Sequence, residues 1–344
     1  MRPRELPLTI SGHFLQGMLE KVLLSGGHDA AMRVLDRSGV VPAFLDHADL
    51  RITRAQFVVA YKAVAAELDD EMHGLWSRPI RSGTLKYLML SLLDAANLGI
   101  ALNRFAHFWN LLLDDYRLSL AREPDRIGIV LEPRAPGTPV NLLGHELLLK
   151  LVHGVVSWLL GKEVPLESVE FSFARPQHAD DYVFLFPGPV GFNHEHSAVW
   201  LAASYGATAF RRTRVDLWPF LRRAPEDWAF TTVNEGLLST KVRRHLAADD
   251  APTAEVADVA RALGMSVRTL TRKLEDEGRP FRTIRDDLRR DMAVHLLTQS
   301  RASIDSIATL VGFANTAAFS RAFKVWMQRS PTSYRKGRKS VESP

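Results

Sequence analysis

The sequence contains no cysteine, and this absence removes several classes of function. Without thiols the chain can form no disulfide bond, no thiolate metal site and no thiol redox switch. A reducing compartment is compatible with this composition. The fold therefore depends on packing, and 46% hydrophobic residues over 344 positions provide enough material for a sizeable core.

The sequence also has little that indicates export or membrane insertion. Residues 1–10 carry arginines, but no apolar run of signal-peptide length follows them. The most apolar later stretch, residues 142–160, is interrupted by two histidines, a glutamate and a lysine. Because a membrane span needs about 20 predominantly apolar residues, we expect a cytoplasmic protein without a membrane partner.

Sequence signatures of catalysis are missing as well. We find no glycine-rich phosphate loop, no G-x-S-x-G elbow and no paired-carboxylate motif. The tripeptide His194, Glu195 and His196 is compatible with a metal clip or a solvated loop, but it has no distant fourth ligand. His145 and His153 miss the i, i+4 spacing of metalloproteases, which leaves a polar helix face or a ligand contact. We expect no enzyme, no cofactor and no metal.

What the sequence does have is positive charge concentrated at one end. Residues 241–344 contain 20 Lys and Arg and 12 Asp and Glu, whereas residues 1–240 contain 24 Lys and Arg and 27 Asp and Glu. A chain of this length has room for two domains. The basic C-terminal part indicates either a polyanionic partner or a solvated basic surface.

The N-terminal two thirds predict a helix-rich α/β domain with an antiparallel sheet. Helical apolar periodicity occurs over residues 14–24, 30–37, 57–68 and 85–93. A long apolar helix is expected at 142–160. Strand candidates are residues 116–120, 126–131, 169–173, 182–186 and 198–201. Trp109, Tyr116 and Trp158 belong either to the core of this domain or to the lining of a pocket.

One helical sequence pattern occurs twice between residues 255 and 335. In the first copy an apolar stripe ends in a glycine turn, at Val256, Val259, Ala260, Leu263 and Gly264. Forty-eight positions later the stripe and the turn recur, at Ile304, Ile307, Ala308, Val311 and Gly312. Such self-similarity is the signature of a repeated structural unit.

The first copy predicts a helix-turn-helix motif. A helix, a tight turn and a second helix capped by Ser266 are the arrangement that presents a helix to the major groove. The inward positions of the second helix are Val267, Leu270 and Leu274. Its outward positions include Arg268, Thr271 and Arg272. An arginine fork can donate twice to guanine, a contact worth ~1–3 kcal/mol of base discrimination.

The second copy has a turn that is longer by one residue. Asn315 is the expected cap, and Phe319 and Phe323 follow Leu270 and Leu274 by 49 positions. The outward residues are Thr316, Ala317, Ser320, Arg321 and Lys324. Residues 281–298 predict a connecting helix of roughly 27 Å, close to the roughly 34 Å between successive major-groove faces. A pair of stacked helices from an unrelated helical repeat is the alternative.

This region resembles the C-terminal signature of AraC/XylS-type transcription regulators over about residues 230–336. The matching residues are Ile304, Ile307, Ala308, Val311, Gly312, Phe313, Phe319, Arg321, Phe323, Lys324, Ser330, Pro331, Tyr334 and Arg335. Gln328 departs from the pattern, because this position is usually a glycine. The resemblance implies an all-α domain with two helix-turn-helix units joined by a helix.

The resemblance also implies roles for individual residues. Base-reading roles fall on Arg268, Thr271 and Arg272 and on Thr316, Ala317 and Arg321. Contacts to the DNA backbone fall on Asn315, Ser320 and Lys324, and Thr269 completes the predicted DNA-binding set. The N-terminal half is similar, more loosely, to the arabinose-binding-type effector domain of one AraC branch, through residues 57–68, 169–173 and 186–193. That domain name does not imply arabinose.

These observations predict a cytoplasmic, sequence-specific DNA-binding transcription regulator controlled by a small-molecule effector. We expect residues 1–225 to form the effector-binding or dimerisation domain, 226–252 a linker helix region, and 253–344 the DNA-binding domain. The implied partners are double-stranded promoter DNA, RNA polymerase and the effector, and a homodimer is open. The alternatives are a regulator acting through protein partners without a small ligand, and an enzyme fused to a DNA tether.

Overall fold

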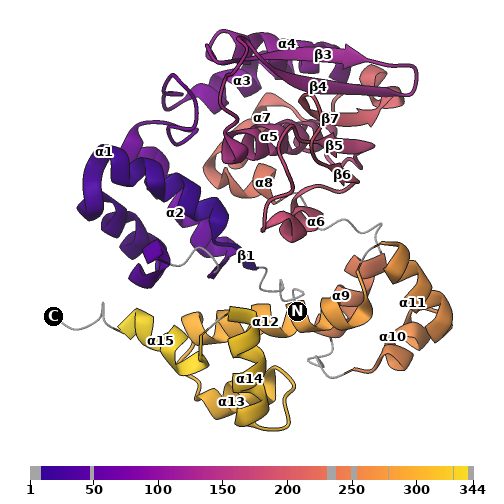
Figure 1. Cartoon of the computed structure of the whole chain (residues 1–344). Coiled ribbons are helices and arrows are strands. Elements are labelled where there is room, and N and C mark those ends of the chain that lie inside the picture. The colour runs from indigo at the N-terminus through magenta and orange to yellow at the C-terminus, as the bar shows by residue number, and fades with distance from the viewer. Residues whose placement is uncertain are drawn as a thin grey trace. The chain divides into compact units, whose positions relative to one another are not determined.

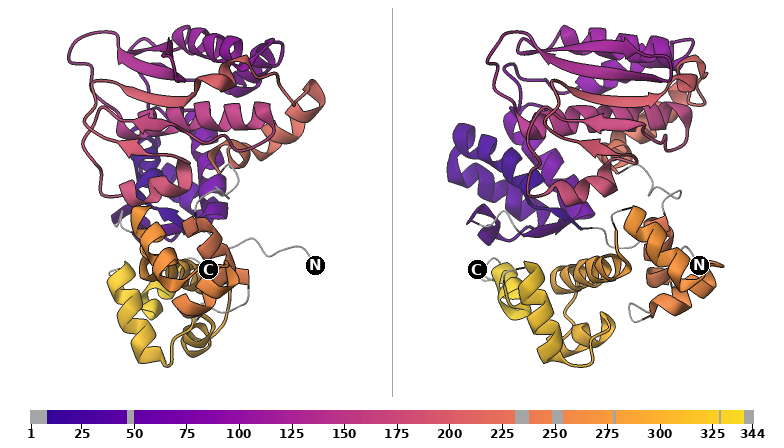
Figure 2. Two further views of the ribbon diagram at one scale, coloured as in Figure 1. Left: turned by 90° about the vertical axis from the view of Figure 1, so that its right-hand side faces the viewer. Right: turned by 45° about the vertical axis from the view of Figure 1, so that its right-hand side comes forward.

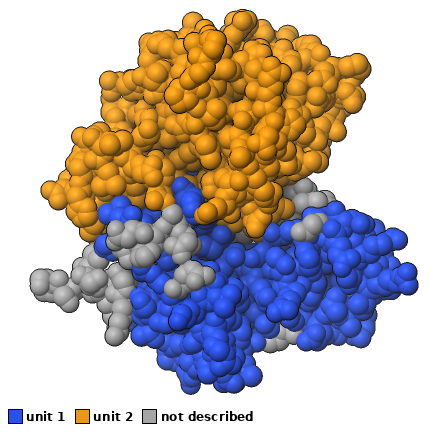
Figure 3. Space-filling model, in the orientation of Figure 1, with its two compact units in different colours: residues 1–13, 38–57, 234–344 blue, residues 14–37, 58–233 orange. Residues whose placement is uncertain are grey.

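The computed structural model describes residues 9–46, 50–230, 238–248, 254–277, 279–327 and 329–339. Its contacts divide the chain into two compact units (Figure 3). Unit 1 comprises Met1–His13, Ser38–Phe57 and Asn234–Pro344, and unit 2 comprises Phe14–Arg37 and Val58–Val233. Two N-terminal segments thus belong by contact to the unit that contains the C-terminal third. The predicted limits at residues 225 and 252 stay predictions.

The helices of unit 2 follow the apolar periodicity of the sequence. They begin with α1 (His13–Ser38), α2 (Arg54–Leu68), α3 (Thr84–Leu93) and α4 (Leu98–Asn110). The two segments predicted at 14–24 and 30–37 both lie within α1. The helix is interrupted between them, because Gly27 adopts a left-handed φ of 71°. The unit ends with α7 (Arg214–Arg223) and α8 (Glu226–Ala229).

A five-stranded sheet lies in unit 2 (Figure 1). Its strands, in spatial order, are β3 (Tyr116–Arg122), β4 (Arg126–Pro133), β7 (Ser197–Ala202), β5 (Ser168–Glu170) and β6 (Val190–Gly191). Neighbouring strands are antiparallel except for β5 and β6, which are parallel. The strands predicted at 116–120 and 126–131 are confirmed as the antiparallel pair β3 and β4, with Leu118 opposite Leu131. The strand predicted at 198–201 is confirmed as β7.

Two strand predictions need correction. Residues 182–186 do not form a strand, since Tyr182–Leu185 is the short helix α6, preceded by a 3-10 turn at Ala179–Asp181. The strand predicted at 169–173 ends at Glu170. The aromatic side chains that suggested strands pack on one another instead, with the ring of Phe171 5.4 Å from that of Tyr182. Tertiary packing here overrides the strand propensity of aromatic residues.

The helix α5 (Leu142–Leu160) forms the centre of unit 2 and packs against β4 and β7 (Figures 1 and 2). Asn141 caps its start, and Gly161 ends it in the left-handed conformation. The helix is long and apolar enough to cross a membrane, but 94% of its apolar stretch is buried inside the protein. Its composition is therefore that of a core helix.

The polar residues of α5 lie in this interior and not on an exposed polar face, which was one of the two possibilities that the sequence allowed. The Nδ1 atom of His145 lies 2.8 Å from Ser197 Oγ, and His153 Nε2 lies 2.9 Å from the carbonyl oxygen of Val164. Burial lowers the pKa of His145 to about 4 and the pKa of His153 well below its usual value. Both imidazoles are therefore neutral at pH 7.

Glu146 and Lys150 of the same helix are buried with partners of their own. Glu146 Oε1 lies 2.7 Å from His178 Nε2 and also accepts a hydrogen bond from the Tyr182 hydroxyl. The Lys150 ammonium donates to the carbonyl oxygen of Leu185 at 2.5 Å. Burial lowers the pKa of Lys150 to about 7. These contacts tie α5 to α6, which is a structural reason for the helical conformation of residues 182–185.

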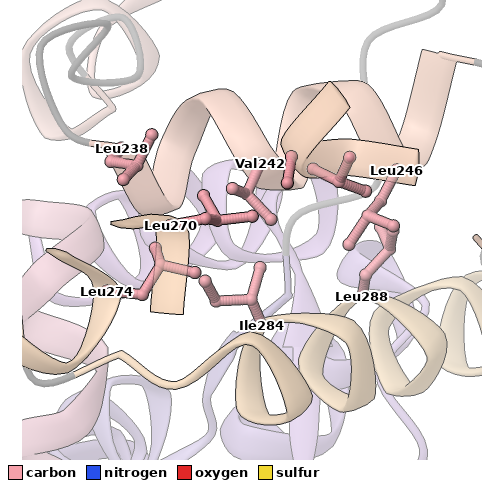
Figure 4. Close-up of a cluster of buried hydrophobic side chains, with 9 residues drawn as sticks. Leu238, Val242, Leu246, Leu270, Leu274, Ile284 and Leu288 are labelled. Carbon is pink, nitrogen blue, oxygen red and sulfur yellow. The ribbon is translucent and has the colours of Figure 1, made fainter. Parts of the chain in front are cut away.

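Unit 1 is mainly helical. Its helices are α9 (Leu238–Ala248), α10 (Val256–Ala262), α11 (Val267–Asp276), α12 (Phe281–Gln299), α13 (Ile304–Leu310), α14 (Thr316–Met327) and α15 (Pro331–Lys339). Figure 4 shows part of its core, in which α9, α11 and α12 bring together Leu238, Val242, Leu246, Leu270, Leu274, Ile284 and Leu288. The connecting helix predicted at 281–298 is confirmed as α12.

A short β-ribbon from the N-terminal part of the chain completes unit 1. Strands β1 (Thr9–Ser11) and β2 (Arg51–Thr53) pair antiparallel and pack against α12. The hydroxyl of Thr9 donates to Asp291 of α12. The hydroxyl of Tyr334 in α15 donates to the carbonyl oxygen of Arg51 at 2.8 Å. Segments separated by about 280 residues in sequence therefore share one core.

Candidate nucleic-acid interface

The first helix-turn-helix unit is built by α10 and α11. Gly264 adopts a left-handed φ of 67° in the turn, a conformation that favours glycine. The backbone N–H of Met265 donates to the carbonyl oxygen of Ala260 at 2.9 Å and closes the end of α10. Ser266 Oγ then accepts from the N–H of Thr269 at 3.1 Å, which confirms Ser266 as the cap of α11.

The second unit repeats this geometry in α13 and α14. Gly312 has a φ of 82°, and the N–H of Phe313 donates to the carbonyl oxygen of Ala308 at 2.9 Å. Asn315 Oδ1 accepts from the N–H of Ala318 at 2.8 Å and is the predicted cap. Its position follows that of Ser266 by 49 residues, whereas the glycines are 48 apart. The longer second turn is thus confirmed.

The inner faces of α11 and α14 agree with the predicted pattern at every position but one. Leu270, Leu274, Phe319 and Phe323 are fully buried. Val267, predicted to face inward, is 41% exposed. It is the first residue of α11, and at a helix start the adjoining turn leaves a side chain less covered.

The outward residues of α11 fall into two groups. Arg268 and Arg272 are exposed, whereas Thr269 and Thr271 are partly buried. The hydroxyl of Thr269 lies 2.8 Å from Ser266 Oγ, so it is engaged in the cap of its own helix. The two arginines are the polar groups of this predicted set that extend furthest into solvent.

On α14 the predicted residues gather around a shallow hollow. Asn315, Thr316, Ala317 and Arg321 line it together with Asp305 and Thr309 of α13. The Thr316 hydroxyl donates to the Asp305 carboxylate. Ala317, Arg321 and Lys324 are exposed, and Ser320 is partly buried. Asp305 and Thr309 were missed in the sequence, because their place in the hollow depends on how α13 packs on α14.

The cations of these outward faces differ from several other cations of unit 1 in their partners. Arg243, Arg279 and Arg290 each form an ion pair with an aspartate. Arg268, Arg272, Arg321 and Lys324 form no ion pair with the acidic residues that the structure describes. Unpaired arginine and lysine side chains can bind phosphate oxygens or base edges without first breaking an ion pair. The four cations are therefore available to bind a polyanion.

The length of the connecting helix can be compared with the spacing of the major groove. Figure 1 shows α12 running from the α10–α11 pair to the α13–α14 pair. Its 19 residues correspond to about 28 Å, while successive major-groove faces lie roughly 34 Å apart. The arrangement is able to offer two helices to one side of a duplex.

Unit 2 contains a cavity of about 460 Å³. Helices α2, α3, α4, α5, α7 and α8 all contribute to its wall. Trp109 is buried, with 1% of its surface exposed, and also lines this cavity, whereas Tyr116 and Trp158 are buried core residues. The cavity lies within the size range of small-molecule sites.

The histidine-rich tripeptide does not gather into a metal cluster. Glu195 Oε1 lies 3.7 Å from His196 Nε2, and His194 Nδ1 lies 4.0 Å from Glu170 Oε2. Over the described ranges, no group of three or more histidine, cysteine, aspartate or glutamate side chains is arranged to hold a metal ion.

Comparison with known proteins gives two family-model matches. Residues 27–209 match the model described as the arabinose-binding domain of AraC transcription regulators, and residues 259–337 match a helix-turn-helix domain model. The first match spans more than half of the chain. The second begins within α10 and extends through the second helix-turn-helix unit into α15.

Relatives of known name match most of the chain. The ornithine utilization regulator of Pseudomonas aeruginosa is 26% identical over 308 residues, covering 88% of this chain and 89% of the relative. The regulator VirS of Mycobacterium tuberculosis is 26% identical over 312 residues, with the same coverage. The structure of CdpR from P. aeruginosa aligns over 94% of this chain and 98% of its own, with 20% identity and a TM-score of 0.32. The ornithine utilization regulator and VirS are regulators, in agreement with the expectation that this chain is not an enzyme.

Proposed function

The chain belongs to the AraC family of transcription regulators, and from this premise we propose that α11 and α14 read a promoter sequence under the control of a small-molecule effector bound by unit 2. The observation that supports this proposal is the pair of capped helices whose exposed arginines have no acidic partner in the described chain. Such side chains are suited to guanine edges and to phosphates.

The two helices differ in the chemistry they would offer to DNA. On α11, Arg268 and Arg272 favour hydrogen-bond readout. On α14 the small side chain of Ala317 suits a thymine methyl group beside Arg321, and Asp305 can accept from the amino group of cytosine. Lys324, further along the helix, would neutralise a phosphate and add affinity without sequence preference.

RNA polymerase contact, homodimerisation and a cytoplasmic location are also part of this proposal. Palindromic or directly repeated half-sites in the selected DNA would report on the number of protomers bound. Sedimentation of the full chain with and without that DNA would measure the oligomeric state directly.

A regulator that responds to a protein partner is the second candidate. It is favoured by an exposed patch on α3 and α7, in which Tyr87 is 63%, Val215 82% and Trp218 56% exposed. Exposed aromatic groups of this kind are enriched at protein interfaces. Replacing Val215 by Ser would abolish regulation in cells without changing DNA binding if this candidate is correct.

The decisive experiment is selection of bound DNA by the full chain from random and genomic fragments at moderate salt. We expect a defined motif that competes well over unrelated DNA, because base contacts and not charge alone set the preference. Equal retention of all fragments would contradict the proposal. Thermal unfolding across a metabolite panel would then identify the effector, since a ligand selective for the native state raises its stability.

A further inference from the structure

The cavity of unit 2 has a predominantly apolar wall. Large apolar side chains line it, from α3, α5, α7, α8 and the segment between α2 and α3, among them Met72, Leu88, Leu151, Leu221 and Trp228. Desolvation of such a wall favours a ligand with a sizeable apolar body. A sugar or another densely hydroxylated molecule would need many more polar partners than these side chains supply.

Trp109, one of the residues that line the cavity, carries a hydrogen-bond donor that lacks an acceptor among the described residues. Trp109 is 1% exposed, and its indole Nε1 has no hydrogen-bond partner within the described ranges. The Tyr61 hydroxyl in the same wall, by contrast, donates to the carbonyl oxygen of Glu71 at 2.9 Å. A buried donor without a partner is unfavourable, and an acceptor on a bound ligand would remove that cost.

The acidic side chains at the cavity already have partners. Glu71 accepts from the backbone N–H groups of Gly83 at 2.6 Å and Leu85 at 2.8 Å. Asp69 accepts from Arg81 at 2.6 Å. These carboxylates are occupied by the protein itself, so they leave little capacity to bind a cationic ligand.

A lysine at the cavity has no such anionic partner. The Lys86 ammonium lies 5.2 Å from the ring centroid of Trp218 and 5.4 Å from that of Tyr87. It forms no ion pair with any carboxylate of the described chain. Lys62, the other lysine of the wall, donates to the carbonyl oxygen of Arg222 at 3.1 Å. Lys86 is therefore the cation best placed to meet a charged ligand.

We propose that this cavity binds an apolar organic acid, whose carboxylate is held by Lys86 and whose body carries a hydrogen-bond acceptor for the indole N–H of Trp109. The inference rests on effector control of the regulator and names the site and the chemical class of the effector. The apolar wall selects against polyols, and the ammonium of Lys86 selects against amines.

The test uses the full chain and three probes that share a phenyl ring and a short chain. These are 3-benzoylpropionate, with a ketone and a carboxylate, 4-phenylbutyrate, with a carboxylate alone, and 4-phenylbutylamine, with a cation. Calorimetric titration should show saturable binding of both acids, tighter for the ketone, and at least tenfold weaker binding of the amine. Equal affinity for amine and acid would overturn the assignment.

Variants separate the two contacts. Lys86→Gln should weaken both acids at least tenfold, and Trp109→Phe should reduce the affinity for 3-benzoylpropionate to that for 4-phenylbutyrate. Lys162→Gln, a lysine also placed over an aromatic ring but outside the cavity, and Trp76→Phe, another buried indole without an acceptor, are the matched controls. An unchanged acid affinity in folded Lys86→Gln, judged by its circular dichroism, would refute the site.

DNA binding distinguishes failure of this inference from failure of effector control. If an acid binds through Lys86 but leaves promoter affinity unchanged, the cavity assignment stands and effector control by this class fails. If another metabolite changes promoter affinity equally in the native chain and in Lys86→Gln, effector control stands and the cavity assignment fails.

Discussion

Asp291 of α12 and Arg243 of α9 form a buried ion pair, with Arg243 Nη2 2.5 Å from Asp291 Oδ2. The two residues are only 1% and 5% exposed. The same carboxylate accepts from the Thr9 hydroxyl and lies 3.9 Å from Arg51 Nε. One carboxylate thus joins the N-terminal ribbon, α9 and the connecting helix of the DNA-binding unit.

Removing this carboxylate should strongly destabilise unit 1. We expect Asp291→Asn to cost about 3–5 kcal/mol, because it leaves the buried Arg243 guanidinium without its counter-charge. Native-state hydrogen exchange of α9 and α12 peptides would measure the loss within this unit. The control is Asp286→Asn on the same helix, whose exposed pair with Arg282 should be worth at most about 1 kcal/mol. Comparable effects of the two variants would argue against a structural role for Asp291.

The same carboxylate predicts an acid-sensitive contribution to stability. Burial alone would raise the pKa of Asp291, but the charges of Arg243, Arg290 and Arg51 outweigh it and lower the pKa. A lowered carboxyl pKa gives stability that is fully present above the unfolded value of about 3.9 and is lost as the pH falls through the folded value. The free-energy difference between the native chain and Asp291→Asn should therefore be constant near neutrality and shrink below about pH 4. Denaturant titrations over that range would show it, and a difference that persisted at pH 2 would contradict the assignment.

Tyr334 should contribute a hydrogen bond that holds α15 to the ribbon. Its hydroxyl is the donor to the carbonyl oxygen of Arg51, and the residue is 6% exposed. Tyr334→Phe should cost about 1 kcal/mol of unfolding free energy, since the acceptor is left unsatisfied. Tyr87→Phe, at a 63% exposed tyrosine, should change the stability by less than about 0.5 kcal/mol. If both variants unfolded at the same denaturant concentration, the contact would carry no stability.

Arg272 and Arg321 should carry specific DNA affinity. Replacing either by alanine is expected to cost about 1–3 kcal/mol on the selected motif, which corresponds to about 5- to 150-fold in dissociation constant. Arg78→Ala, at an exposed arginine of unit 2, makes the same change in net charge and should have little effect. Fluorescence anisotropy with the motif and with scrambled DNA measures both. Equal losses on the two DNAs would assign the arginines to phosphate contacts.

Local features of the recognition units could be predicted because each depends on residues that are close in sequence. A cap such as Ser266 or Asn315 is decided by a hydrogen bond to a residue three positions on. The helical period that buries Leu270 and Phe319 acts over the same short range. The exposure of Val267 was not predictable in this way, since it depends on what covers a helix start.

The family membership, the duplicated units and their unequal turns follow from the order of residues alone, because they are patterns within single helices and turns. Tertiary structure decided the rest. It placed Thr9 against Asp291, made residues 182–185 a helix through the contacts of Glu146, and enclosed Trp109 beside a cavity. These outcomes depend on segments that are distant in sequence meeting in one core, and no local period or cap encodes such meetings.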